Sequence, residues 1–143
     1  MKRASVYVFK TYYLVHSQST TTTGFGVASE PYIKMDKDVA MEELANKVII
    51  AMNCSKVNVA ESTDHSMESF LKAIDLKRHE DLYLQSIHCM IYEKDNKFIF
   101  IPSINGGIKG GFRYLPKQKI EISSGATIDV ISDALEKTLS LCE

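Results

Sequence analysis

The pattern of apolar and polar residues predicts three neighbouring strands in the second half of the chain. Residues 86–93 and 97–101 are two runs of strand-forming residues, and a third run covers residues 112–115. Between the first two, the Asp-Asn pair at 95–96 tolerates the left-handed backbone angles of a tight hairpin turn. Both of these runs are apolar on both of their sides, which is typical of strands covered on two faces. We therefore expect this hairpin in the middle of a sheet, covered by the rest of the chain.

Two further strand regions are predicted in the first part of the chain. Residues 5–15 are rich in β-branched and aromatic residues and form one long or two short strands. The polar residues 18–23 are expected to be a solvated loop at a hairpin tip. Residues 24–29 and 32–35 indicate another strand, which is interrupted or lies at a sheet edge because Pro31 lacks a backbone donor.

Apolar residues at helical spacing predict a first helix after this strand. Asp36 or Asp38 can cap its free backbone amides, and residues 53–56 end it. Its apolar face should pack against the sheet, and it carries Met41, Leu44, Ala45, Val48, Ile49 and Met52.

A second, shorter helix is predicted over residues 67–74, after a loop. Either Asp64 or Ser66 can cap it. Residues 76–84 are ambiguous in this pattern, and they fit a short helical turn with a charged face.

The last part of the chain completes the expected fold. Residues 119–123 alternate between polar and apolar side chains, as in a half-exposed strand. Thr127 then caps a final helix that runs to Leu141. Strands and helices are interleaved, so we expect one α/β (α+β) layered domain over residues 1–143. Its mostly antiparallel central sheet is packed with about three helices.

Composition excludes some classes of partner. The 143 residues include 17 Lys plus Arg and 18 Asp plus Glu, for a formal net charge of -1, which argues against an electrostatic nucleic-acid binder. The three cysteines are an odd number with no close pair in the sequence, so we expect no disulfide framework and a reducing cytoplasm. No stretch resembles a signal peptide or a membrane-spanning helix, and no membrane partner is expected.

No motif in the sequence indicates a catalytic or metal site. The glycine-rich residues 104–111 lack the spacing of a phosphate-binding loop and precede a strand, so they are expected to be a hairpin connection or bulge. The alternative is a mobile loop that contacts a partner. The four histidines lack metal-binding spacing, and we expect no metal or cofactor. His88 lies in an apolar strand and is expected to be a core residue with one hydrogen bond.

Aromatic residues near basic residues allow a second interpretation. Tyr12, Tyr13, Phe112 and Tyr114 lie on predicted strands, as in a platform that stacks single-stranded nucleic acid. Core and edge packing fits the balanced charge better.

Five passages together resemble the immunity proteins of bacterial contact-dependent growth inhibition (CDI) systems. GVASEPYIKM follows the first strand pair, and MEELANKVIIAMNCSK forms the first helix, with VNVAESTD after it. KFIFIPSINGGIKGGFRYLP covers the later strands, and ISDALEKTLSLCE closes the chain. The similarity extends over most of the length and lies in the overall pattern of the chain.

The resemblance implies a binding protein without enzymatic activity. Such a protein holds the C-terminal toxin domain of a large, surface-delivered effector of the same cell inactive in the cytoplasm. The toxins are often nucleases, with RNase or tRNase activity common. Because a nuclease surface is generally basic, we expect the immunity protein to present an acidic face to it.

Acidic side chains gather in three places, and two of these are favoured as the toxin contact. The first place, residues 36–43, is regular, whereas residues 57–84 are the least regular part of the chain, and irregular loops on a fixed sheet commonly carry recognition. Aromatic anchors would complete the interface. The predicted contacts are Glu61, Asp64, Glu68, Glu80 and Asp81, with Tyr83 and Tyr32 as anchors.

Two other functions remain open at this point. A basic sheet face with exposed, stacked tyrosines would favour a module that binds single-stranded nucleic acid. A deep pocket that gathers His16, His79 or His88 with a carboxylate would favour a small enzyme. An acidic surface with few pockets would favour the immunity protein.

Overall fold

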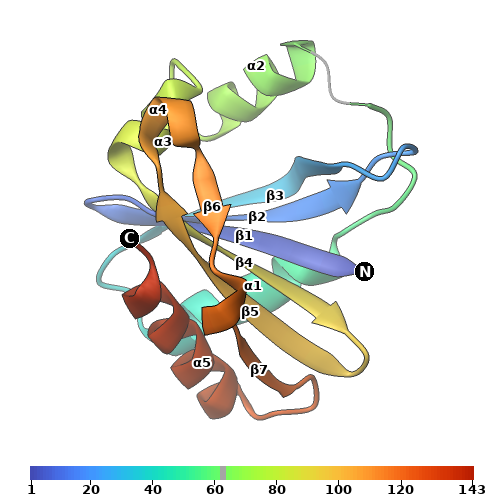
Figure 1. Cartoon of the computed structure of the whole chain (residues 1–143), viewed down its shortest axis with the longest axis vertical. Helices are drawn as coiled ribbons and strands as arrows, with labels where there is room; N and C mark the ends of the chain where they lie inside the picture. The colour runs from blue at the N-terminus through green and yellow to red at the C-terminus, as the bar shows by residue number, and fades with distance from the viewer. Residues whose placement is uncertain (62–63) are drawn as a thin grey trace.

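A seven-stranded antiparallel sheet forms the centre of the computed structural model (Figure 1). The model describes the backbone of residues 1–61 and 64–143 and the side chains of residues 1–61 and 68–143. The strand order is β3-β2-β1-β4-β5-β6, and β7 pairs with β5 beside β6. The strands are β1 (Lys2–Val8), β2 (Tyr12–Thr20), β3 (Gly26–Asp36), β4 (Ile87–Lys94), β5 (Lys97–Asn105), β6 (Phe112–Tyr114) and β7 (Ile120–Ser123).

Five helices accompany the sheet in the described part of the chain. They are α1 (Met41–Asn53), α2 (Asp64–Ala73), α3 (Glu80–Gln85), α4 (Gly107–Gly110) and α5 (Ile128–Leu141), with a short 3-10 helix at Pro116–Gln118. The expected α+β architecture is therefore confirmed: α3 overlaps the residues that fitted a short helical turn, whereas the sequence did not indicate α4. The β4–β5 hairpin lies inside the sheet as predicted, and Asp95 and Asn96 adopt positive φ angles at its turn.

One face of the sheet is covered by α1 and α5. Leu44 and Val48 of α1 and Leu135 of α5 are buried against the strands. Alternate residues of the inner strands point toward them because successive strand side chains face opposite sides of the sheet. These buried strand residues include Ala4, Val6, Val15, Cys89, Ile91, Phe98 and Phe100.

The opposite face carries a smaller core under α2 and α3. Phe70 and Ile74, from α2 and the turn after it, and Leu82 of α3 are buried against Phe9 and Leu14. Figure 1 shows α2, α3 and α4 gathered at one end of the molecule, whereas α5 lies toward the other end. The two faces thus differ in the extent of their apolar cover.

The structure corrects the predicted loop over residues 18–23. β2 continues to Thr20, which pairs with Gly26 of β3, so only the residues after Thr20 form the turn. The backbone of residues 56–59 hydrogen-bonds to Thr20 and Thr22 and adds a further partner to this end of β2. Serine and threonine side chains are polar, yet their backbone groups pair as well as those of any other residue. β3 continues through Pro31 at the sheet edge.

The predicted start of the first helix is also wrong. Its N-cap is Ala40, which makes no side-chain capping bond, while Asp36 still belongs to β3. α2 begins at Asp64, three residues before the predicted start, and therefore includes Ser66. Thr127 does occupy the N-cap position of α5, although its side chain caps no amide.

The cysteines are free, but two of them meet in the fold. Cys89 of β4 is buried, and Cys142, which follows α5, packs against the same core and donates its thiol to the carbonyl oxygens of His88 and Thr138, each at 3.3 Å. Interaction with the Cys142 thiol and burial raise the pKa of the Cys89 thiol. The sequence shows no close pair because the two residues are brought together only by the packing of α5 on the sheet.

Candidate functional site

The helices α3 and α4 form a ridge at one end of the molecule, which we call the α3–α4 ridge (residues 80–85 and 107–110). The two helices lie side by side although they are separated by the β4–β5 hairpin in the sequence (Figure 1). Leu84 is 58% exposed and Ile108 is 53% exposed, so each helix presents a large apolar side chain to solvent. Because α3 and α4 are in contact, these two side chains add apolar surface to the same end of the molecule.

Asn105 at the end of β5 holds the two parts of the ridge together. Its side-chain amide donates to the carbonyl oxygens of Tyr83 and Ser86, each at 2.7 Å. Its side-chain oxygen accepts a hydrogen bond from the Gly107 amide at 2.9 Å. One side chain thereby fixes the end of α3 and the start of α4, two segments with little local support of their own.

The glycine-rich segment becomes helical because glycine permits the backbone angles at both ends of α4. Gly107 and Gly111 have φ angles of 76° and 62°, which strain other residues. The Gly111 amide donates to the Gly107 carbonyl at 2.8 Å, and the Gly106 amide donates to the Gly111 carbonyl at 2.7 Å. The segment is the β5–β6 hairpin connection, as predicted, and it presents Ile108 and Lys109 at the surface.

Three of the predicted contact residues lie on this ridge. Glu80 and Asp81 occupy the first turn of α3, where carboxylates interact favourably with the helix dipole. Asp81 pairs with Arg78 at 3.0 Å, whereas Glu80 is exposed. Tyr83 is half-buried, with its ring 5.1 Å from that of Phe112, so part of this side chain serves packing.

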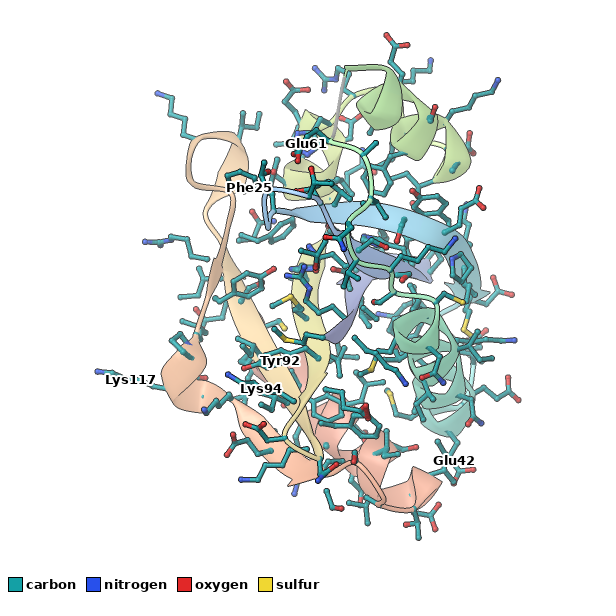
Figure 2. The ribbon with its side chains drawn as sticks, turned by 90° about the vertical axis from the view of Figure 1, so that its right-hand side faces the viewer. Phe25, Glu42, Glu61, Tyr92, Lys94 and Lys117 are labelled. Carbon is teal, nitrogen blue, oxygen red and sulfur yellow. The ribbon has the colours of Figure 1, made fainter. Side chains whose placement is uncertain are left out.

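The other predicted contacts lie on neighbouring elements at the same end. Glu61 accepts hydrogen bonds from the hydroxyls of Thr22 and Thr23, which lower the pKa of its carboxyl group. It therefore ties the β2–β3 turn to the loop before α2, next to the exposed Phe25 (Figure 2). Glu68 is exposed on α2, and the side chain of Asp64 lies outside the described residues.

Tyr32 is mainly a packing residue. Its ring centroid lies 5.6 Å from Phe70 and 5.9 Å from His16, between the edge strand β3 and α2. Leu84 and Ile108 are exposed on the ridge but were not among the residues predicted from the sequence. Each of them is an apolar residue in a polar or glycine-rich segment, which could have drawn attention to it. The local sequence did not show that the two segments lie side by side in the fold.

A second acidic group lies on the other helical layer, where α1 and α5 begin. The Glu42 carboxyl group interacts with that of Asp129, and this second acidic group raises the pKa of the Glu42 carboxyl group. Asp133 and Glu136 line the same shallow groove. Figure 2 shows Glu42 at the opposite end of the molecule from Glu61. The two acidic regions are therefore distinct surfaces.

A cavity of about 200 Å³, which we call the histidine cavity, lies between the sheet, Phe70 of α2, and Leu82 and Tyr83 of α3. His16, His79 and His88 all line it, as the enzyme hypothesis required, but none of the described residues that line it is an Asp or a Glu. Burial lowers the pKa of His16 to about 4 and that of His88 to about 3. Both imidazoles are thus neutral near pH 7.

The expected hydrogen bond of His88 is not present. Neither ring nitrogen of His88 has a partner among the described residues, and the same holds for Nε2 of His16. His16 Nδ1 lies 2.7 Å from the Ser17 carbonyl oxygen. The strand pattern predicted burial correctly, but a hydrogen-bond partner depends on the elements that fold over the strand.

The aromatic residues do not form a single stacking platform. Tyr13 is buried in the core under α1 and α5, whereas Tyr12 stacks on Phe9 on the other face. Phe112 and Tyr114 belong to the short strand β6. The positions of these aromatic residues therefore do not support the hypothesis of a module that binds single-stranded nucleic acid.

The described residues contain neither a cluster suited to a metal ion nor a helix suited to a membrane. No group of three or more His, Cys, Asp or Glu side chains in this part of the chain is placed to hold a metal ion. Within the same residues, no helix has the length and apolar character needed to cross a bilayer.

One family model matches nearly the whole chain, and two solved structures share its fold. The family model of CdiI, described as CDI immunity protein, matches residues 2–142. A protein of unknown function from Neisseria meningitidis has a similar solved structure, with a TM-score of 0.79 and 14% identity, covering 99% of this chain and 95% of that one. A chain of the CdiA-CT/CdiI toxin and immunity complex from Yersinia pseudotuberculosis has a TM-score of 0.78 and 14% identity, covering 99% and 97%. A search of curated proteins gives no match.

Proposed function

The chain belongs to the family of CDI immunity proteins, and we propose that it binds and neutralises one cognate toxin, the C-terminal domain of a CDI effector made by the same cell. Family membership across residues 2–142 is the observation that carries this proposal. The similar fold of a chain from a toxin and immunity complex supports it. The protein acts in the cytoplasm as a stoichiometric binding partner that protects the producing cell.

The toxin contacts the end of the molecule that carries the α3–α4 ridge. Leu84 and Ile108 supply exposed apolar surface, and apolar or aromatic anchors provide most of the energy of a protein interface. Acidic residues of α2, α3 and the loop before α2 complete the proposed contact surface. The proposed contacts retain Glu61, Asp64, Glu68, Glu80, Asp81, Tyr83 and Tyr32, with Leu84 and Ile108 added at the centre.

The cognate toxin is a nuclease, with RNase or tRNase activity as the first candidates. A nuclease must attract a polyanion, so its active-site surface is basic. Carboxylates such as Glu80 and Glu68 would steer this surface toward the ridge and increase the rate of association. Binding there would exclude nucleic acid from the basic surface.

Co-purification with the toxin tests the proposed function. The full chain is expressed with the C-terminal domain of the effector encoded beside it, and survival and elution are measured. One stable complex in living cells, with toxicity when the immunity protein is omitted, is the expected result. Separate elution, or cell death in the presence of both proteins, would refute the proposal.

Matched variants then test the ridge as the contact surface. Leu84→Asp and Ile108→Asp each place a charge where an apolar anchor is proposed, and we expect at least about tenfold weaker binding from each. Val130→Asp is the control, because Val130 is also an exposed apolar residue but belongs to α5. Equal losses in all three variants would contradict the assignment of the surface while leaving the function intact.

A further inference from the structure

The histidine cavity has a composition that the toxin-binding role does not require. Both imidazoles are almost completely buried, with His16 2% exposed and His88 3% exposed. Three ring nitrogens, Nε2 of His16 and both nitrogens of His88, have no partner in the described part of the chain. A buried polar group without a hydrogen bond destabilises a fold, so these nitrogens need a partner inside the cavity.

The tautomer of His16 follows from its one contact. A carbonyl oxygen only accepts hydrogen bonds, so the 2.7 Å contact with Ser17 places the proton on Nδ1. Nε2 therefore carries a lone pair and faces the cavity as an acceptor. His88 is neutral as well, and its two nitrogens supply one donor and one acceptor.

Aromatic rings form most of the remaining wall. Tyr7 lies between the two histidines, with ring centroids 5.6 Å from His16 and 4.6 Å from His88. Phe112 lies 5.1 Å from both His88 and Tyr83, which links the sheet to the ridge above it. Aromatic walls with a few placed polar groups are characteristic of sites for small ring compounds.

Charge and size restrict the ligand further. None of the described residues lining the cavity is an Asp, Glu, Lys or Arg, so a charged ligand would be desolvated without compensation. A volume of about 200 Å³ is several times the volume of one water molecule and is close to that of cavities that hold a single aromatic ring.

From these observations we propose that the histidine cavity is a binding site for a small, uncharged, single-ring aromatic compound that carries a hydrogen-bond donor. The donor of the ligand meets the acceptor nitrogen of His16 or of His88, and the ring packs against Tyr7 and Phe112. The deep burial of both imidazoles favours a free molecule over a side chain of a docked protein. Tyr83 lines this site and also belongs to the proposed toxin contact, but the test of the site needs no toxin.

Phenol and toluene provide a matched pair of probes. They have nearly the same shape, but only phenol has a donor. Binding to the full chain is measured by the side-chain ¹⁵N resonances of its histidines and by thermal unfolding. We expect saturable phenol binding that shifts the resonances of His16 and His88, with toluene binding about tenfold more weakly because it forms no hydrogen bond.

Variants distinguish phenol binding in the histidine cavity from nonspecific binding elsewhere on the protein. His88→Phe retains a ring of similar size and removes two nitrogens, and it should abolish the preference for phenol over toluene. Tyr13→Phe, on the other face of the sheet, should retain that preference. If His88→Phe does not fold, the same loss of preference is tested with His16→Phe, together with the ¹⁵N shifts of His16 and His88 in the wild-type chain. No saturable phenol binding, equal affinity for both probes, or unshifted His16 and His88 resonances would overturn the proposal and leave a cavity that holds water only.

Discussion

On one face of the sheet, α1 and α5 pack over a continuous apolar core, whereas on the other face α2, α3 and β6 cover a core with two histidines and a cavity. On the first face, the buried hydroxyls of Ser132 and Thr138 each donate to a helix carbonyl at 2.7 Å. On the second, three imidazole nitrogens have no partner in the described residues. The buried hydroxyls on the first face thus have hydrogen-bond partners within the fold, whereas these imidazole nitrogens on the second face do not.

This difference suggests that the first face mainly stabilises the fold and that the second face carries the proposed binding sites. A dense apolar core releases much water and stabilises the fold, but it leaves no group available to a partner. The second face has a smaller apolar core and therefore contributes less stability. It carries both the histidine cavity and the α3–α4 ridge. We therefore expect substitutions on the two faces to have effects of different kinds.

Among single substitutions, the largest expected effect is on stability and follows from Leu44→Ala on the first face. Leu44 is fully buried between α1 and the sheet, and truncation of such a side chain leaves a cavity that costs about 3 kcal/mol. Leu84→Ala on the ridge should change the free energy of unfolding by less than about 0.5 kcal/mol. Urea unfolding of both variants measures this, and equal losses would remove the distinction between the faces.

Acid should destabilise the second face first. The unfolded chain protonates its histidines near pH 6.5, but the folded chain protonates His16 only near pH 4 and His88 only near pH 3. The unfolded state therefore binds more protons between these values, and stability falls as the pH falls. At pH 5 we expect a loss of about 2 kcal/mol for each histidine relative to pH 7.5.

Denaturant unfolding at pH 7.5, 6 and 5 measures this loss. The double variant His16→Phe and His88→Phe should lose most of the dependence between pH 7.5 and pH 5 while the carboxylates remain ionised. A wild-type stability that stays constant down to pH 5 would show that the two imidazoles are not buried as neutral groups.

A smaller loss of stability is expected from Asn105→Ala, which tests whether the α3–α4 ridge can be loosened without loosening the rest of the fold. The substitution removes the hydrogen bonds to Tyr83, Ser86 and Gly107, so about 2 kcal/mol should be lost. Amide exchange should accelerate in α3 and α4 and remain unchanged in α5. Uniform acceleration over the whole chain would mean that Asn105 supports the entire fold and not the ridge in particular.

The smallest expected effect concerns the rate of toxin association. Glu80→Lys should slow association by a factor of about three at low salt, because it reverses a charge beside the proposed contact. Half-molar salt should remove most of the difference. Glu42→Lys is the matched control at the other end of the molecule, and a larger effect from Glu42→Lys would place the acidic contact on α1 and α5.

The sequence was sufficient where local patterns decide the structure. The apolar stripe of α1 and the Asp95–Asn96 turn of the β4–β5 hairpin each lie within a few consecutive residues, and both were predicted. The glycine-rich α4 was not predicted, since glycine disfavours helices and the support comes from Asn105 and the glycine backbone itself.

Features that depend on distant segments could not be predicted. The meeting of Cys89 and Cys142, the histidine cavity and the α3–α4 ridge each require elements far apart in the chain. The acidic residues were visible in the sequence, but their grouping was not: Asp129 joins Glu42 only because α5 packs beside α1. The grouping of acidic residues on the surface therefore depends on the fold and cannot be read from the composition.

Hydrogen exchange of the immunity protein, alone and in complex with its toxin domain, tests the central claim most directly. We predict slower exchange in the complex at Glu80–Gln85 and Gly107–Gly110, with little change at the start of α1 and in α5. Protection confined to α1 and α5, with none at the ridge, would contradict the account and move the toxin-binding surface to the other helical layer.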